Sequence, residues 1–323
     1  MPSACGESAL LSSPTSGRVP ASTPWSPGSD ATCSSSPEPR ARTGRDGRLH
    51  LAFEARGDRT VLTARRFTLP LQALEPMDLD GDGVATLLLL NPTGGLLGGD
   101  HLEIDVLVGP GSRVCLSTPS ATRVYRSRGA DTVQRITLNV GRGAALEWLP
   151  DHLIPSPGAR LRQATRVRLA ADATLLYLDA WAVGRAARGE AWEFDRLDSS
   201  LFVRDEIGPL LRERSILTGH PPRDGLGATE GFGYVATFVA MRPAGVAMRP
   251  VGEGWEALAG ALQAEVEAVA TGGRVGVTRL GRDGVLARLL CPSAPALQAA
   301  VETLWAICRR RLLGLPPARL RKP

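Results

Sequence analysis

Three segments of the sequence repeat one pattern, in which an apolar strand end is followed by a tight turn and the start of another apolar strand. They begin at Val108, Val140 and Leu169, and are therefore 32 and then 29 residues apart. Repeats of this length form units that bury their apolar faces against their neighbours instead of closing into a barrel. The repeat predicts a mostly β fold of stacked sheets, helicoidal and similar to a β-solenoid.

Alternation of apolar and polar residues predicts further strands along the first two thirds of the chain. The segments are 49–54, 60–64, 84–90, 101–108, 133–140, 162–169, 191–197 and 201–206, together with 113–118, 145–149 and 174–179 after the three turns. No helix is predicted before about residue 217.

The last third of the sequence changes to a helical period. Apolar residues from Trp255 to Val269 form one helical face, and Gly272-Gly273 predicts the end of that helix. A hairpin of strands 274–280 and 285–291 follows, with turn residues between them. Ser293 then predicts the cap of a second helix, which has Pro295 in its first turn.

Composition divides the chain into four parts. Residues 1–45 are rich in Ser, Pro, Gly, Thr and Ala, and are predicted to form a disordered arm. Residues 46–250 are predicted to form the stacked β-sheet domain, residues 251–315 a helix, hairpin and helix packed on it, and residues 316–323 a basic tail. The arm lacks the pattern of a secretory signal, although a transit peptide or a misassigned start codon remains possible.

Charge, cysteine usage and hydropathy exclude several classes of protein. The five cysteines are scattered without a Cys-x-x-Cys pair, which favours reduced thiols and a cytoplasmic location; Cys115 and Cys308 are predicted to lie in the core. No segment is apolar for the length that a bilayer requires, so no membrane association is expected. The formal charge of +5 comes from scattered arginines, and no nucleic-acid-binding module is present.

A loop with two glycine pairs, Asn91 to Asp100, lies between the strands 84–90 and 101–108. Glycine pairs indicate a turn, or a close approach that a side chain would block. The loop ends in an acidic residue and enters a strand, so it does not fit a phosphate-binding loop or a dinucleotide fingerprint. A structural turn or a loop that docks a partner is the better interpretation.

Two other segments suggest metal binding. Asp78, Asp80 and Asp82 followed by Gly83 match the start of a calcium loop, but the position of the bidentate glutamate is Leu89 and a strand follows, which favours an acidic hairpin turn.

Asp151-His152 is the best pair for a divalent cation such as nickel, with a solvent-exposed turn as the favoured alternative. No catalytic triad is apparent, and no site residue is predicted to be catalytic.

Several motifs, in order along the chain, resemble the urease accessory protein UreD/UreH family. They are Asn91-Pro-Thr-Gly-Gly-Leu-Leu-Gly-Gly-Asp100, Ser117 to Ser127, Ala144-Ala-Leu-Glu-Trp-Leu-Pro150, Gly184-Arg185 with Gly189-Glu190, and the segment from Leu304 to Gly314. The likeness covers about residues 48–315. The motif residues singled out are Gly94, Gly95, Gly98, Gly99, Asp100, Thr118, Arg123, Tyr125, Glu147, Trp148, Pro150, Gly184, Arg185 and Glu190.

The resemblance implies a non-catalytic chaperone for urease maturation. Its expected partners are the urease apoprotein, a second accessory protein of the F type and a GTPase of the G type, within a complex in which the chain is dimeric. No cofactor is expected to be tightly bound, because nickel would be in transit through an internal passage. Asp100, Glu147, Asp151 and His152 are predicted to contribute to this passage or its mouth through weak contacts.

The sequence departs from the family at a few places. The family commonly has Lys where this chain has Arg123, and Gln-Glu where it has Asp151-His152.

The basic run Arg309 to Arg311 and the tail after Gly314 predict an exposed end at which the accessory partner docks. The alternatives that remain are a structural or binding β-solenoid unrelated to nickel and an unrecognised hydrolase that uses Asp100 or His152.

Overall fold

The three predicted turns lie one above another and join strands of two different sheets. The computed structural model describes residues 44–219, 229–244 and 252–320. One residue at the same place in each turn has a left-handed backbone, with φ of 68°, 62° and 58° at Gly111, Gly143 and Asp172. Neighbouring turns bond to each other, since Gly111 N donates to Arg142 O and Gly143 N donates to Ala171 O. The predicted repeat is therefore confirmed.

The first sheet has seven strands in the order β16-β15-β11-β8-β5-β1-β2. The five inner strands are parallel and the two edge strands pair antiparallel with their neighbours. The bounds are β1 Asp46–Arg56, β2 Arg59–Thr68, β5 His101–Val108, β8 Thr132–Val140, β11 Arg160–Leu169, β15 Arg196–Arg204 and β16 Pro209–Thr218.

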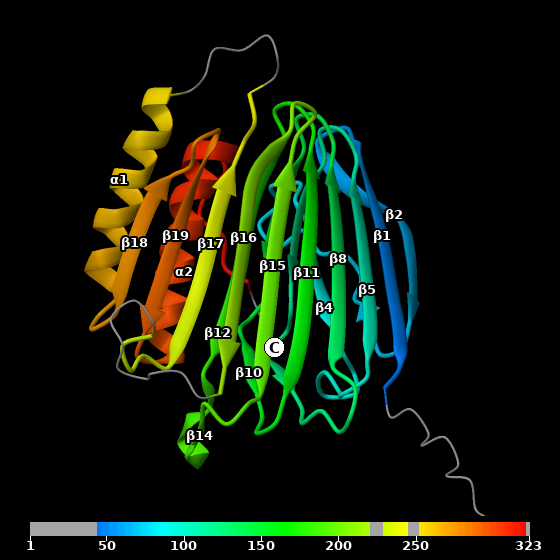
Figure 1. Ribbon diagram of the computed structural model, residues 1–323. Coiled ribbons are helices and arrows are strands. Elements are labelled where there is room, and N and C mark those ends of the chain that lie inside the picture. The colour runs from blue at the N-terminus through cyan, green and yellow to red at the C-terminus, as the bar shows by residue number, and fades with distance from the viewer. Residues whose placement is uncertain (1–43, 220–228, 245–251, 321–323) are drawn as a thin grey trace, which may run out of the picture. The chain divides into compact units, whose positions relative to one another are not determined.

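The second sheet has ten strands, with the main order β18-β19-β17-β12-β9-β6-β4-β3. Its bounds are β3 Gln72–Ala73, β4 Ala85–Leu90, β6 Arg113–Ser117, β9 Ala145–Leu149, β12 Thr174–Ala182, β17 Tyr234–Met241, β18 Arg274–Arg279 and β19 Gly284–Cys291. Two short strands lie off this order: β10 Leu153–Pro155 pairs with β12, and β7 Thr122–Val124 pairs with β10. Figure 1 shows the seven-stranded sheet in front and strands of the ten-stranded sheet behind it.

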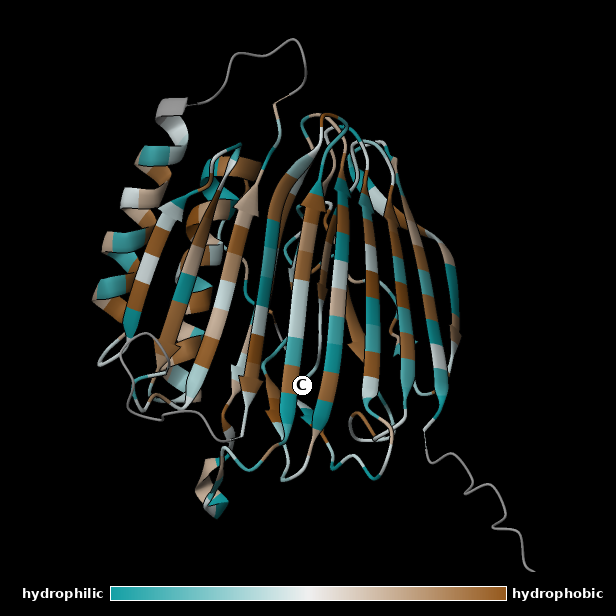
Figure 2. Cartoon of the chain, viewed as in Figure 1, coloured by the Kyte–Doolittle hydropathy of each residue, from teal (hydrophilic) through white to brown (hydrophobic). Residues whose placement is uncertain are grey.

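The two sheets pack face to face around an apolar core. On the strands of the seven-stranded sheet, alternate residues are buried, as in the pattern of β11, where Leu161, Val167 and Leu169 point inward. This alternation follows from the two-residue period of a strand with one face in contact with a core. It is visible as alternating bands along the front strands in Figure 2. The sequence prediction of stacked, mostly β sheets is confirmed.

Two helices cover the other face of the ten-stranded sheet near β17–β19. They are α1 Gly252–Val269 and α2 Ala294–Cys308, and α2 continues into a π-helical turn, Arg309–Leu313. Their apolar faces form a second core with residues such as Leu176 and Phe238 on the sheet. Ser293 caps α2 through its side chain, and both Cys115 and Cys308 are buried, as predicted. No helix in the described part of the chain is long and apolar enough to cross a membrane.

The structure corrects two strand predictions. The segment 191–197 is not one strand, because Trp192 has a left-handed backbone with φ of 63° and separates the short strand β14, Glu190–Ala191, from β15. The strand predicted at 174–179 continues to Ala182, so Asp179 lies inside it and not at its end. Of the predicted arm, only Gly44 and Arg45 lie within the described residues, which also exclude 321–323 of the predicted tail.

Candidate functional site

Four connections lead from the ten-stranded sheet back to the seven-stranded sheet, and they stack at one end of the molecule. They span residues 91–100, 118–131, 150–159 and 183–195. Backbone hydrogen bonds join each connection to the next, from Leu96 N to Arg123 O, from Ser127 N to Gly158 O and from Gly158 N to Glu193 O. We call these four connections the return end. Most of the motif residues singled out in the sequence lie here, although they are up to about a hundred residues apart.

The glycine-rich loop 91–100 lies directly against the next connection. A Cβ atom on Gly95 would stand 2.5 Å from Arg123 O, and a Cβ atom on Gly98 would stand 2.6 Å from Ser127 Cα. Both distances are too short for any side chain, so the loop requires glycine at these places. The prediction of a close approach is confirmed, and Gly94 and Gly99 add left-handed positions with φ of 84° and 88°.

Asp100 holds this loop closed through its carboxylate. Its Oδ1 accepts a hydrogen bond from Arg45 N at 2.9 Å, and its Oδ2 accepts one from Leu97 N at 2.8 Å. The side chain is buried. Two other motif residues have similar local roles, since Tyr125 Oη donates to Gly94 O at 3.4 Å and Thr118 Oγ1 accepts from Asp151 N at 2.9 Å.

The last motif forms a small hairpin in the fourth connection. The strand β13, Gly184–Arg185, pairs with β14, and the 3₁₀ turn Ala186–Arg188 joins them. Arg185 and Glu190 form an ion pair across this hairpin. The backbone of Gly184 has φ of 132°, and a Cβ atom there would stand 2.2 Å from Glu190 O. The motif is therefore explained by the geometry of the hairpin.

A cavity of about 80 Å³ lies between the two sheets next to the return end. Its walls include the motif residues Trp148 and Pro150, and its polar lining comes from Ser117, Thr118, Gln134, Asp151, Gln163 and Asp179. Most of the space between the sheets is apolar, so a concentration of hydroxyl, amide and carboxylate groups at one place marks the cavity as a candidate site.

Asp179 is the central acid of this cavity. It lies on the face of β12 that points toward the seven-stranded sheet, where Ser199 Oγ donates to its Oδ2 at 2.6 Å and Gln163 Nε2 donates to its Oδ1 at 3.4 Å. Burial raises the pKa of Asp179, and the hydrogen bond from Ser199 opposes this shift. None of the described Arg or Lys residues forms an ion pair with it. A partly buried acid of this kind, beside a cavity, is poised to accept a proton or a cation.

A second hollow, of about 420 Å³, lies between the ten-stranded sheet and α2. Asp151 and His152 line it together with Gln298, Glu302 and Trp305. The ring of His152 packs edge-on against Tyr234, with 5.2 Å between centroids. Asp151, with Pro150, Leu178 and Ala180, also lines the cavity between the sheets. Asp151 therefore lies where the two spaces adjoin.

Glu147 points from β9 to the opposite side, toward the helices. Its Oε1 lies 3.0 Å from Nη1 of Arg309, and Trp305 Nε1 donates to its Oε2. Arg309 also pairs with Asp82, the last acid of the segment that resembled a calcium loop. Burial raises the pKa of Glu147 more than the neighbouring Arg309 charge lowers it. These contacts join β9, the segment before β4 and the end of α2.

The prediction of an exposed basic run at 309–311 is wrong for its first residue. Arg310 and Arg311 are exposed, whereas the side chain of Arg309 is only 2% exposed because it is turned inward to Glu147 and Asp82. A run of three arginines on a helical turn cannot place all three on the same face, and here the π-helical turn directs one into the core.

The four predicted metal ligands are thus only partly brought together. Asp151 and His152 share one hollow, Glu147 lies in the helix-side core with Arg309, and Asp100 closes the glycine-rich loop. Among the described residues, no three His, Cys, Asp or Glu side chains gather as a metal site. Sequence reasoning missed Asp179, Gln163 and Arg309. A lone carboxylate in the otherwise apolar strand Leu175 to Ala182 was the available signal for the first.

Comparison with known proteins identifies the family. The family model of the UreD urease accessory protein matches residues 45–323. The urease accessory protein UreD of Alkalilimnicola ehrlichii is 36% identical over 295 residues, which cover 91% of this chain and 95% of that protein. The UreD proteins of Dechloromonas aromatica and Deinococcus radiodurans are 37% and 35% identical, covering 83% and 87% of this chain and 90% and 96% of those proteins. The chain belongs to the UreD family of urease accessory proteins.

Proposed function

We propose that this protein is a urease maturation chaperone that binds apo-urease and conducts nickel to it through the space between its two sheets. Family membership supports the role in urease maturation. The observation that carries the finer proposal is the polar cavity beside the return end, where Asp179, Gln163 and Asp151 face a common space. Nickel is the cargo in this proposal, with no cofactor tightly bound.

The chemistry of the lining suits an ion that passes through. Carboxylate, amide and hydroxyl oxygens bind a divalent cation more weakly than a closed set of imidazoles and thiolates. A conduit must bind an ion well enough to admit it and weakly enough to release it. Gln163 Nε2 lies 3.4 Å from Asp179 Oδ1, and the amide and carboxylate oxygens of these two side chains offer such a binding step within the cavity.

The route that we propose leads from the hollow beside α2, past Asp151, into the cavity that contains Asp179. His152 lies at the α2 side of this route and Asp151 at the junction of the two spaces. Asp100 and Glu147 were also predicted to contribute, but their carboxylates accept hydrogen bonds from Leu97 N and Arg309 respectively. We therefore assign them to the structure that supports the route and propose Asp179 as the acid that meets the ion.

The proposed partners follow from the family. They are apo-urease, a second accessory protein of the F type and a GTPase of the G type, in a cytoplasmic complex that contains two copies of this chain. The protein itself is proposed to catalyse no reaction. The remaining exposed arginines, Arg310 and Arg311, are available for docking the accessory protein at the end of α2.

Two alternatives would leave the same fold without nickel transport. A structural or binding β-solenoid needs the repeat but not the polar cavity, and a hydrolase needs a nucleophile or a metal-bound water near Asp100 or His152. The buried position of Asp100 and its two backbone donors disfavour a hydrolytic role for it.

The test uses a host that carries a complete set of urease genes and is supplied with nickel. Deleting the gene for this protein should abolish most urease activity, and restoring it should return the activity, while immunoblots show equal amounts of apo-urease throughout. A strain restored with Arg142→Gln, at an exposed turn that is given no binding role, serves as a control for expression of a variant chain. Full urease activity in the deletion strain would overturn the proposed function.

A further inference from the structure

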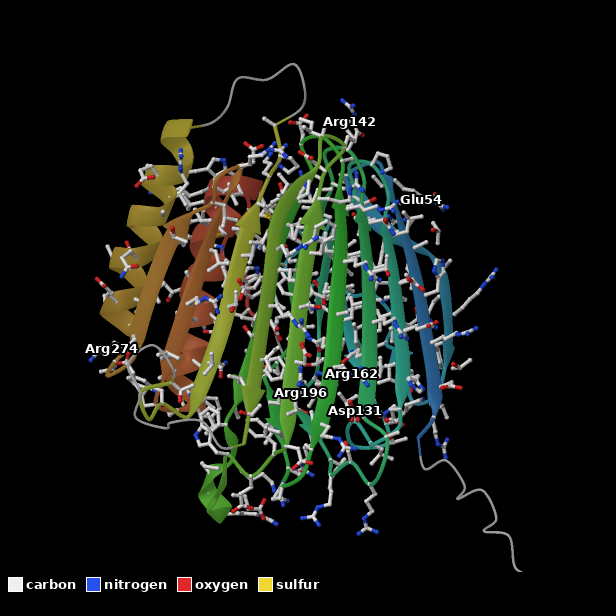
Figure 3. All side chains as sticks on the ribbon, viewed as in Figure 1. Glu54, Asp131, Arg142, Arg162, Arg196 and Arg274 are labelled. Carbon is white, nitrogen blue, oxygen red and sulfur yellow. The ribbon has the colours of Figure 1, made fainter. Side chains whose placement is uncertain are left out.

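The outer face of the seven-stranded sheet carries an arginine cluster on the three strands nearest its β16 edge. Arg166 and Arg168 point outward from β11, Arg204 from β15 and Arg212 from β16, and all four are exposed. They surround the half-buried ring of Phe202, and the guanidinium carbon of Arg212 lies 5.4 Å from the centre of that ring. We call Arg166, Arg168, Arg204 and Arg212 the arginine quartet. Figure 3 shows side chains standing out across this face.

The register places these arginines side by side. Arg168 is the direct partner of Arg204 on the neighbouring parallel strand, and Arg166 and Arg212 flank Phe202 from opposite sides. Neighbouring strands are about 4.8 Å apart, so charges of the same sign at paired positions repel each other. The fold alone gains nothing from this repulsion.

Carboxylates do not neutralise the quartet. Other arginines on the same face are paired, since Asp198 binds Arg196 and Arg214, and Asp131 binds Arg160 and Arg162. By contrast, no residue in the described part of the chain forms an ion pair with a member of the quartet. The face thus separates into arginines that have carboxylate partners and arginines that present their charge to solvent, which include the quartet and Arg135 on β8.

The surface around the quartet is hollowed and partly apolar. Arg166, Phe202 and Arg212 line one depression of about 790 Å³, and Arg168 and Arg204 line a second of about 390 Å³ toward the strand ends. Leu107, which is 49% exposed, also lines the second depression. Arginine mixed with aromatic and aliphatic side chains is typical of surfaces that bind proteins. Helices cover the ten-stranded sheet, whereas none of the described residues covers this face (Figure 1).

We propose that the arginine quartet and Phe202 form a docking surface for an acidic segment of a partner protein. Guanidinium groups pair with carboxylates through two parallel hydrogen bonds, and four of them around an apolar ring match a segment that combines several Asp or Glu side chains with an apolar one. This surface lies on the opposite side of the seven-stranded sheet from the cavity, so the inference does not depend on nickel transport.

The experiment measures binding of two probes of matched length and charge to the full chain. One is a fluorescent peptide of glutamates with a central leucine, and the other is a fluorescent single-stranded oligonucleotide. The test variant changes all four quartet residues from Arg to Gln. The control variant carries Arg56→Gln, Arg66→Gln, Arg113→Gln and Arg142→Gln, which remove the same charge from exposed positions elsewhere.

The proposal predicts that the quartet variant binds the peptide about tenfold more weakly than wild type at physiological salt, while the control variant changes its affinity less than about threefold. Because the repulsion between Arg168 and Arg204 is removed, the quartet variant should melt no lower than wild type, which excludes misfolding as the cause. Equal loss of affinity in both variants would show that only net charge matters and would overturn the proposal. Tighter binding of the oligonucleotide, lost in the quartet variant, would overturn the choice of a protein partner.

Discussion

The ten-stranded sheet carries one acid on each face, and the two have different surroundings. Glu147 faces the helices and is neutralised by Arg309, which also binds Asp82. Asp179 faces the seven-stranded sheet, accepts hydrogen bonds from Ser199 and Gln163, and lines a cavity. Burial raises the pKa of both acids.

This difference separates an acid that stabilises the fold from one that can serve a function. A buried ion pair compensates both charges and leaves them no capacity for another ligand. An acid that is buried beside a cavity without a cation keeps its ability to bind a proton or a metal ion. In the sequence, both residues are carboxylates within apolar strands and cannot be told apart. Their different roles follow from the groups that surround them in the fold.

The largest expected effect comes from removing the cation of the helix-side pair. Arg309→Met leaves Glu147 and Asp82 without their partner and should lower the free energy of unfolding by about 3–5 kcal/mol. Urea denaturation followed by circular dichroism measures this difference. The matched control is Arg310→Met at the neighbouring exposed position, which should change stability by less than about 0.5 kcal/mol. Equal effects of the two variants would contradict the assignment of Arg309 to the core.

A second substitution tests why Arg309→Met should destabilise the protein. Adding Glu147→Gln to Arg309→Met removes the unpaired buried charge while keeping an oxygen that accepts from Trp305 Nε1. The double variant should recover about 1–3 kcal/mol relative to Arg309→Met alone, because most of the penalty arises from the orphaned carboxylate. The same urea series gives this value. A double variant that is less stable than the single one would show that Glu147 carries no such penalty.

Asp179, the acid between the sheets, should make the stability of the protein depend on pH. Its pKa is raised in the folded protein, so the carboxyl group favours folding most at pH values below its ordinary pKa of 3.8. That contribution is lost as pH rises from there through the raised pKa, because the charged form is the less stable one in the folded state. The stability of wild type relative to Asp179→Asn should therefore fall across this range.

Denaturation of both proteins at a series of pH values measures this difference. Asp105→Asn, at an exposed outward position of β5, is the control variant for the loss of a carboxylate and is measured at the same pH values. A constant difference between wild type and Asp179→Asn would mean that the pKa of Asp179 is the same in the folded and unfolded states, and would remove the physical basis for its proposed role.

The smallest effect concerns the glycine-rich loop. Gly98→Ala places a methyl group too close to Ser127 and should lower the free energy of unfolding by about 1–3 kcal/mol. The comparison is Gly129→Ser in the neighbouring connection, where a side chain meets open space. Because Gly129 has a left-handed φ of 99°, this substitution should cost about 1 kcal/mol. Thermal melting of the two variants ranks them. A larger loss for Gly129→Ser would contradict the close packing of the loop.

Much of the fold was accessible from the sequence because it depends on local patterns. The three turns recur with the same left-handed position, and the helix, hairpin and helix of the last third follow from periodicity and from the cap at Ser293. The order of the strands in two sheets was not accessible in detail. The motifs of the return end were recognised one by one, but nothing in their spacing indicates that the connections stack on one another.

The candidate site was less accessible, because its members come together only through long-range packing. Glu147 and Arg309 are 162 residues apart, and an arginine in a basic run is indistinguishable in sequence from its exposed neighbours. The sequence pattern predicts a strand that ends at Asp179, whereas pairing with β17 extends that strand to Ala182 and turns the carboxyl group inward. Asp151 and His152 were found by residue type, and the structure adds the hollow that they line.

The most direct test of this account compares urease activation by wild type, Asp179→Asn and Asp105→Asn in the nickel-supplied host, with the accessory complex isolated from each strain. The account predicts that Asp179→Asn still assembles with its partners but activates urease at least about tenfold less, because the cavity loses its ionisable oxygen. Asp105→Asn should activate urease as wild type does. Full activation by Asp179→Asn, with nickel incorporated into urease at the wild-type level, would contradict the proposal that nickel passes between the two sheets.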